Sequence, residues 1–256
     1  MVWPGRREPL EDALYDSQAL RGFARIDLAA EGVPDATTLL KFRRRLETHN
    51  LCQGLFAAIN ADLTARGLLL RAGTLVDATL IAAPPSTKNQ EKQRDPEMHQ
   101  TQKGNQWYFG MKAHIGADRD SKLVHPVVVT AAHVADITKT AERLHGQEQQ
   151  VHADAGYPGV EKRAEIAALE RKIDWQIARK RGPIKAMVEG AEKETLKAVE
   201  QAKASVRAFV EHPFHILKNL FRHRKVRYRG LAKNGHQLSS LFGLATVMIA
   251  GRTATP

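Results

Sequence analysis

The 256-residue sequence contains a single cysteine, Cys52, and only 6% aromatic residues. One cysteine excludes an internal disulfide bond and a zinc site built from several thiolates. We therefore expect Cys52 to be a small buried residue rather than a reactive nucleophile. The sequence also lacks any apolar run of the ~20 residues that a membrane-spanning helix needs. The apolar residues 238–250 are too few, so they are interpreted as a buried C-terminal helix, and no membrane span is expected.

Acidic residues are absent after Glu211, and this unevenness locates the positive charge of the chain. The sequence has 39 Lys and Arg against 28 Asp and Glu, a formal net charge of +11. Residues 161–256 hold 20 basic and 9 acidic residues, whereas residues 1–160 hold 19 of each. A solvated basic surface is one interpretation. Apolar residues alternate with the bases after Glu211, however, so this segment is expected to fold, and its charge favours a polyanionic partner.

Hydrophobic periodicity predicts helices in residues 1–70. Apolar residues recur at spacings of three to four between Leu10 and Leu20, as they do on one face of a helix. After a break at residues 32–34, either Asp35 or Thr37 is a candidate cap for a second amphipathic helix. We therefore expect a small helical N-terminal region.

A change of pattern at Leu68 predicts the start of a sheet. Residues 68–81 are apolar and β-branched with Asp77 in their middle, which is typical of a buried strand. The polar residues 83–106 are interpreted as a loop insertion. Further strands are predicted at 107–115, 122–130, 149–153 and 173–178, and helices at 136–145, 160–171 and 189–210. This order predicts an α/β fold with a mixed sheet flanked by helices.

Three carboxylates stand at positions where a negative charge needs compensation. Asp77 interrupts an apolar strand, Asp154 ends a later strand, and Glu211 lies near the end of a long helix in a basic segment. Each has a structural alternative, as a paired strand residue, a turn residue or an ordinary helix carboxylate. Together they suit Mg²⁺ or Mn²⁺, which prefer oxygen ligands. Two such ions support in-line displacement at a phosphodiester.

Basic residues accompany Glu211 at helical spacing. Arg207, Glu211, Lys218 and Arg222 fall at i, i+4, i+11 and i+15, which places them on one face of a helix. Pro213 is expected to disturb this alignment, because a proline inside a helix kinks or breaks it. Bases beside a metal-binding carboxylate can hold phosphate groups.

Other residue types were weighed for ligand binding. His212, His215 and His223 lack the spacing of a strong zinc site and are interpreted as DNA-facing or packing residues. Trp107 and Tyr108 could stack on a base, but core packing is the favoured interpretation. Lys103-Gly104 is not part of a phosphate-binding loop, so no nucleotide cofactor is expected.

Several motifs resemble those of the DDE transposases of the IS5 group, within the broader family that has the IS4-type signature. Residues 154–157, Asp-Ala-Gly-Tyr, match the motif Asp-x-Gly-Phe/Tyr. Arg207, Glu211 and Lys218 match Tyr-x2-Arg-x3-Glu-x6-Lys. Asp77, in the stretch TLVDATLI, matches the first acidic position. Further similar stretches, such as WYFGMKAHIGAD, extend the resemblance over nearly the whole chain.

The resemblance implies an RNase H-like catalytic domain that cuts transposon ends and transfers the strands into target DNA. Asp77, Asp154 and Glu211 would be the catalytic, metal-binding triad for Mg²⁺ or Mn²⁺, with two ions. Arg207, Lys218 and Arg222 would bind DNA. The resemblance also implies a homo-oligomer on DNA, in the bacterial cytoplasm and associated with the nucleoid. A generic RNase H-like nuclease is disfavoured by the spacing around Glu211.

The sequence departs from the family pattern at two places. Ala204 stands where the signature has tyrosine, and family members carry a further helical segment before the stretch LEDALYDS. We therefore expect residues 1–70 to be a shortened DNA-binding region. Residues 71–256 would form the RNase H-like domain, with the polar insertion at 83–106. An N-terminally truncated, non-catalytic DNA-binding remnant of a transposase is the alternative function.

Overall fold

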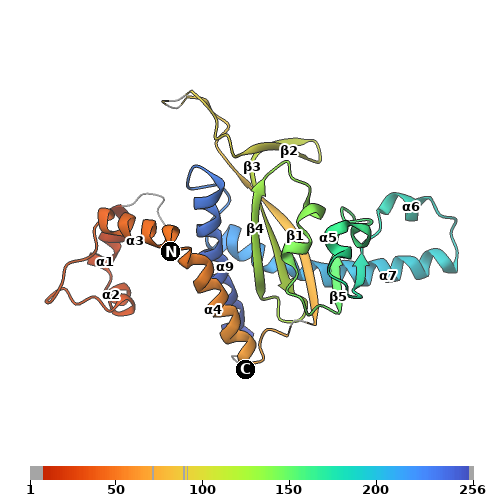
Figure 1. Cartoon of the computed structure of the whole chain (residues 1–256), viewed down its shortest axis with the longest axis horizontal. Helices are drawn as coiled ribbons and strands as arrows, with labels where there is room; N and C mark the ends of the chain where they lie inside the picture. Colours follow the sequence, from red (N-terminus) through yellow and green to blue (C-terminus); the bar gives the residue numbers. More distant parts are fainter. Residues whose placement is uncertain (1–7, 71, 89, 91, 254–256) are drawn as a thin grey trace. The chain divides into compact units, whose positions relative to one another are not determined.

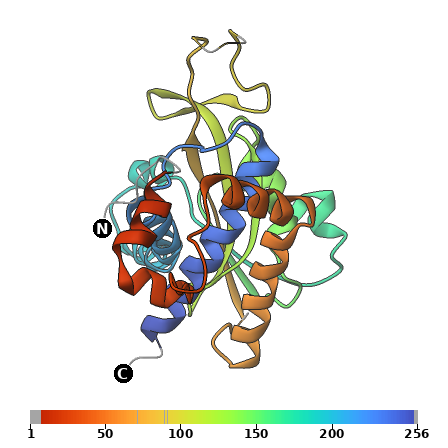
Figure 2. The ribbon, with the colours of Figure 1, turned by 90° about the vertical axis from the view of Figure 1, so that its left-hand side faces the viewer.

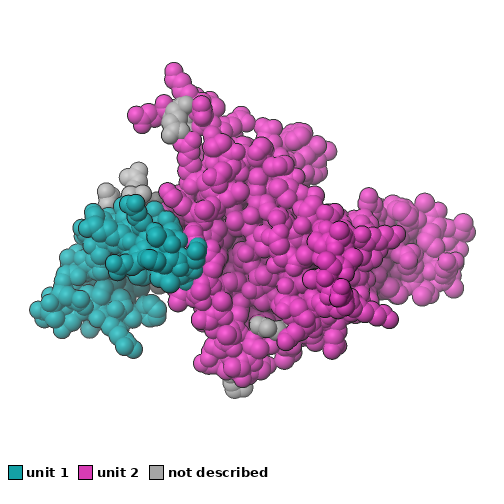
Figure 3. All heavy atoms as spheres, in the orientation of Figure 1, with its two compact units in different colours: residues 1–52 teal, residues 53–256 magenta. Residues whose placement is uncertain are grey.

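The computed structural model describes residues 8–70, 72–88, 90 and 92–253. Residues 1–7 of the predicted N-terminal region and residues 89 and 91 of the polar insertion lie outside the described residues. The chain divides into two compact units, residues 1–52 and residues 53–256, which Figure 3 distinguishes by colour. Each unit is described by itself.

The first unit is helical, as the periodicity predicted. It contains α1 (Glu8–Asp16), α2 (Gln18–Ala24) and α3 (Ala36–Thr48). The carboxylate of Asp35 caps α3 by accepting a hydrogen bond of 2.6 Å from the amide of Thr38, which satisfies one of the free amides at the helix start. The cap predicted at Asp35 or Thr37 is thus Asp35.

Helix α4 (Leu51–Ala65) begins at the end of the first unit and otherwise lies in the second. The predicted N-terminal region of residues 1–70 therefore includes a helix that belongs mainly to the larger unit. Cys52 is only 5% exposed, which confirms that it is a buried residue.

The second unit is built on a six-stranded mixed sheet (Figure 1). Its strands are β1 (Gly73–Ala82), β2 (His99–Lys103), β3 (Gln106–Asp118), β4 (Val124–Ala131), β5 (Gln150–Ala153) and β6 (Asp174–Ile177). Strand β3 pairs antiparallel with β1, β2 and β4. Strand β5 lies parallel to β1 and β6 parallel to β5. This is the predicted mixed sheet.

Apolar side chains cover both faces of the sheet. On one face, Leu75 and Ile115 pack with Phe214 and Phe242 from the C-terminal helices. On the other face, side chains of β1 and β5 pack with those of the segments that follow β5, in a cluster that includes Val76, Val151, Tyr157, Val160 and Ile166. A sheet buried on both faces explains why β1 is a nearly continuous apolar run.

The remaining elements include η1 (Asp136–Lys139), η2 (Ala141–Arg143), η3 (Val160–Lys162), α5 (Ala164–Ala167), α6 (Arg181–Ala186), α7 (Ala191–Arg207), η4 (Ala208–Val210), α8 (Glu211–His215), the π-helical turn η5 (Ile216–Leu220) and α9 (Leu231–Thr253). Helix α9 is the predicted C-terminal helix, and Leu238, Phe242 and Ala245 on it are fully buried. Figure 2 shows α9 from a second direction. In the part of the chain that the structure describes, no helix has both the length and the apolar character to cross a membrane.

Three predictions of secondary structure were wrong. Residues 136–145 form two short 3₁₀ turns rather than a helix, because the hydroxyls of Thr138 and Thr140 bond to backbone carbonyls of the preceding turn and so compete with a regular helix. Only the start of 160–171 is helical. The polar insertion contains β2, which alternation could not reveal because both its faces are largely exposed.

Candidate active site

Asp77, in the middle of β1, lies level with Asp154, which directly follows the end of β5. Leu75 on β1 pairs with His152 on the parallel strand β5, and each aspartate follows two residues later. Because parallel strands run in step, both carboxylates are set by this register. The pairing of β1 with β5 ends at Leu75 and His152, so the two carboxylates lie just past the carboxyl end of β5, and ligands of α/β sheets commonly bind beyond such ends.

The electrostatics of Asp77 show that the predicted acidic residues share one neighbourhood. Burial, together with the negative charges of Asp154 and Glu211, raises the pKa of Asp77 to about 6. The amide of Ala78 and the positive charge of Arg207 act in the opposite direction. Burial and two acidic neighbours make the ionised form of this carboxylate less stable, and a bound cation would stabilise that ionised form.

The turn after β5 fixes the Asp154 carboxylate. The amide of Gly156 donates a hydrogen bond of 2.8 Å to Oδ1 of Asp154. A Cβ atom at position 156 would stand 2.9 Å from the same oxygen, closer than side-chain carbons normally approach. A side chain at position 156 would therefore force the Asp154 carboxylate to move from its present position.

Arg143 is a residue that the sequence analysis missed. Its side chain is fully buried, and Nη1 donates hydrogen bonds to the carbonyl oxygen of Asp77 (3.3 Å) and to the hydroxyl of Tyr157 (3.0 Å). Nε donates to the carbonyl of Lys139 and Nη2 to that of Asp136. Arg143 thus joins the strand that carries Asp77 to the turn that carries Asp154. An isolated arginine in a polar stretch gave no signal of this role.

Glu211 is the first residue of α8, close to the end of α7. Arg207 ends α7, and its Nη1 lies 4.0 Å from Oδ2 of Asp77, so the basic and acidic positions of the motif meet at β1. The predicted disturbance at Pro213 is confirmed, because the helical path changes from α-helix to a 3₁₀ turn, a short α-helix and a π-helical turn.

Lys218 and Arg222 differ in their relation to Glu211. Lys218 is half-buried in η5; burial and the charge of Lys103 lower its pKa, and Glu211 opposes this effect. Arg222 lies beyond the end of η5 with a φ of 53°. The predicted single helical face therefore reaches Lys218 but not Arg222, because the helix ends first.

Two predictions about aromatic and histidine residues can be compared with the structure. Trp107 is 67% exposed, so the favoured prediction of core packing was wrong for this residue. Trp107 lies in the part of β3 that extends past its pairing with β1. His223 is buried, whereas His215 is exposed and bonds to Asn219.

The predicted metal ligands have the right chemistry but do not form a closed ligand set. Within the described ranges, no three His, Cys, Asp or Glu side chains lie close enough together to hold an ion. Asp77, Asp154 and Glu211 are nevertheless hard oxygen donors, and two of them raise the pKa of the third. Such a set fits Mg²⁺ or Mn²⁺, which keep several water ligands.

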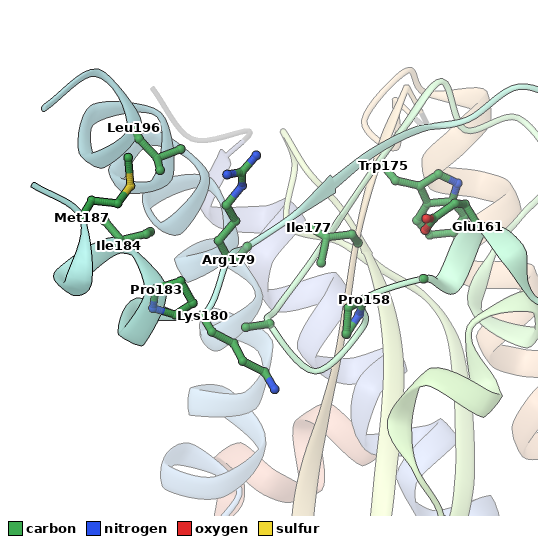
Figure 4. Close-up of a pocket in the computed structure, with 13 residues that line it drawn as sticks. Pro158, Glu161, Trp175, Ile177, Arg179, Lys180, Pro183, Ile184, Met187 and Leu196 are labelled. Atoms are coloured by element: carbon green, nitrogen blue, oxygen red, sulfur yellow. The ribbon is translucent and has the colours of Figure 1, made fainter. Parts of the chain in front are cut away.

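A hollow of about 670 Å³ lies beside the turn that carries Asp154. Figure 4 shows its two sides, with Trp175 and Glu161 on one and Ile184, Met187 and Leu196 on the other. Arg179 and Lys180 also line it. The hollow is therefore mainly apolar with two basic side chains.

Comparison with known families agrees with this geometry. No solved structure matches the chain. Residues 69–247, well over half of the chain, match the family model described as the transposase DDE domain. The mixed sheet flanked by helices is the RNase H-like fold of such transposases, a family that acts on DNA and generally uses divalent metal ions. The chain therefore belongs to the transposase DDE domain family.

Proposed function

We propose that this chain is a transposase of the IS5 group that cuts the ends of its insertion sequence and transfers the strands into target DNA. Asp77, Asp154 and Glu211 are its catalytic triad. The observation that carries this proposal is the raised pKa of Asp77, of about 6, to which both Asp154 and Glu211 contribute. Acidic groups with a perturbed pKa that cluster past the carboxyl end of a strand are typical of active sites.

The same three carboxylates are the proposed ligands of Mg²⁺ or Mn²⁺, with two ions in all. When bound, these ions would activate the attacking hydroxyl group and stabilise the leaving oxygen. The protein contributes the register of β1 and β5, which sets the spacing of Asp77 and Asp154. It also contributes the Gly156 amide, which orients the Asp154 carboxylate.

Arg207, Lys218 and Arg222 are the proposed DNA-binding residues of this site. Arg207 approaches Asp77, and Lys218 lies within the electrostatic reach of Glu211. Their positive charges can hold the phosphates on either side of the bond that is cut. Arg222 lies after the helix, where an exposed arginine can contact a phosphate farther along the backbone.

Arg143 and Tyr157 are proposed as positioning residues. The buried guanidinium group bonds to the Asp77 carbonyl and to the Tyr157 hydroxyl, so it fixes the separation of the two aspartates from within the protein. Neither side chain needs to touch DNA. Tyrosine in the Asp-Ala-Gly-Tyr motif then has a physical purpose, which is to give Arg143 an acceptor.

Residues 1–70 are proposed as a DNA-binding region and residues 71–256 as the catalytic domain. Because joining two transposon ends requires more than one copy of the protein, the proposal includes a homo-oligomer on DNA. It also includes location at the bacterial nucleoid. No feature of the described residues favours the alternative of a non-catalytic remnant.

The test uses the purified chain and duplexes that span the two ends of the element encoding it. With Mg²⁺, the wild type should cut these duplexes. Asp77→Asn, Asp154→Asn and Glu211→Gln should each lose cleavage by at least ~10³-fold, because each removes a ligand of the ions, while still binding the DNA. Glu192→Gln, exposed in the first turn of α7, is the matched control and should cut normally. Full cleavage by any of the three variants would contradict the triad.

A further inference from the structure

Strands β2 and β3 form a two-stranded arm beyond the body of the sheet. The pairing of β3 with β1 ends at Gly110, opposite Ala82. Residues 106–110 of β3 pair with residues 99–103 of β2. Figures 1 and 2 both show this part extending past the end of the sheet. We call residues 99–109 the β2–β3 arm.

The arm is polar, uncharged or basic, and exposed. Residues 98–117 contain no Asp or Glu. Exposed carboxamides and a base occupy it: Gln100, Gln102, Lys103, Asn105 and Gln106. Trp107 adds a large exposed ring. A narrow ribbon that exposes tryptophan and amides and lacks carboxylates is suited to a negatively charged partner with flat, hydrogen-bonding edges.

The arm presents Gln102 and Trp107 on the side of the proposed triad. Side chains alternate along β3, so Trp107 shares a face with Ile115, which pairs with Asp77. Gln102 pairs with Trp107 and shares that face. The charges of Lys103 on the arm and of Glu211 both act on Lys218, which links the arm to the helical side of the site.

We propose that the β2–β3 arm lies in the major groove of the DNA beside the cut, where Gln102 and Trp107 contact base edges. This inference rests on the proposed function. The major groove admits a two-stranded ribbon, glutamine pairs with adenine there, and an apolar ring can contact the thymine methyl group. The arm is therefore a determinant of which end sequence is cut.

The register sets where on the DNA the arm should lie. Trp107 precedes Ile115, the partner of Asp77, by eight residues. At ~3.4 Å per residue this is at most ~27 Å along the sheet. Because B-DNA rises by a similar ~3.4 Å per base pair, the contact is expected within about eight base pairs of the cut.

The test attaches a DNA-cleaving iron chelate to the arm. Cys52 is the single cysteine, so a Cys52→Ser background with Asn105→Cys gives one attachment site at the tip. The protein also carries Asp77→Asn, so that it binds the end duplex without cutting it. The expected result is one cluster of chelate cuts within about eight base pairs of the site that the wild type cuts. The control attaches the chelate at Gln147→Cys, near the opposite end of β1.

Affinity measurements complete the test with variants of the same arm. Gln102→Ala and Trp107→Ala should each weaken binding to the end duplex about tenfold, with little change for random-sequence duplex. Thr101→Ala, on the opposite face of the arm, is the control and should bind normally. Two outcomes would overturn this inference and leave the proposed function standing. In one, the wild type cuts the duplex but the chelate on the arm produces no cuts; in the other, all the variants bind with equal affinity. A change only in self-association would assign the arm to a second copy and overturn it also. A wild type that neither binds nor cuts would instead overturn the proposed function.

Discussion

The hydroxyl group of Tyr157 accepts a hydrogen bond of 3.0 Å from the buried guanidinium group of Arg143, which also donates to the backbone of Asp77. Tyr157 lies three residues after Asp154, so this contact joins the supports of two proposed metal ligands. Burial raises the pKa of the Tyr157 phenol, which keeps the hydroxyl neutral. The two acidic positions are thus held from the interior, behind the surface that would meet DNA.

Tyr157→Phe should slow cleavage about tenfold and raise the Mg²⁺ concentration needed for half-maximal cleavage. The change removes one hydrogen bond to a charged group, worth ~1.5–3 kcal/mol, and leaves the other bonds of Arg143 in place. The turn that carries Asp154 then loses its fixed distance from β1. The measurement is the cleavage rate of end duplex as Mg²⁺ is varied.

Binding of the same duplex without metal separates positioning from a general loss of folding. Ser205→Ala removes an exposed hydroxyl of α7 that bonds to the carbonyl of Gln201 and is the control. If Tyr157→Phe lowered the melting temperature but left the Mg²⁺ dependence unchanged, Tyr157 would be a stability residue and not a positioning residue.

Asp77→Asn should stabilise the metal-free protein above pH 6. The pKa of Asp77 is raised from its ordinary value of 3.8 to about 6 in the folded state, so folding favours the protonated carboxyl. Ionisation of Asp77 therefore lowers the free energy of unfolding. This destabilisation is absent below pH ~4, increases between pH ~4 and ~6, and is constant above pH ~6. Two pKa units correspond to at most ~3 kcal/mol.

Thermal unfolding in EDTA from pH 4 to pH 8 measures this effect. The melting temperatures of wild type and Asp77→Asn should converge near pH 4 and separate above pH 6, with the variant higher. Asp62→Asn, at an exposed position, should follow the wild type throughout. A constant difference between Asp77→Asn and wild type across this range would contradict a raised pKa at Asp77.

Local sequence patterns predicted the parts of this fold that local chemistry decides. The apolar run around Asp77, the turn between β3 and β4, and the strand ending at Asp154 all stand where the pattern placed them. The fold class followed from their order. The register between β1 and β5 places Asp77 level with Asp154. The pattern of a single sequence does not predict this register.

The missed features depend on contacts between distant parts of the chain. The polar sequence around Arg143 suggests an exposed side chain. Its hydrogen-bond partners, the Asp77 carbonyl and the Tyr157 hydroxyl, lie close to it only in the folded chain. The sequence favoured core packing for Trp107 because aromatic residues in strands are often buried. Strand β3, however, extends past its pairing with β1, and Trp107 is exposed in that part of the strand. Arg222 keeps helical spacing in the sequence although the helix has ended.

Lys218→Gln should weaken DNA binding and make it less sensitive to salt. Lys218 is half-buried, and burial together with the charge of Lys103 lowers its pKa, while the charge of Glu211 acts in the opposite direction. A lysine that neutralises one phosphate releases about one counterion, so the slope of log affinity against log salt should fall by about 1. The slope is measured by titrating the end duplex with protein at several salt concentrations between about 50 and 200 mM, a range over which phosphate contacts strongly affect affinity. Lys233→Gln, exposed on α9, is the matched control and should keep the wild-type slope. If both variants shifted the slope equally, the effect would reflect net charge alone and Lys218 would have no particular phosphate partner.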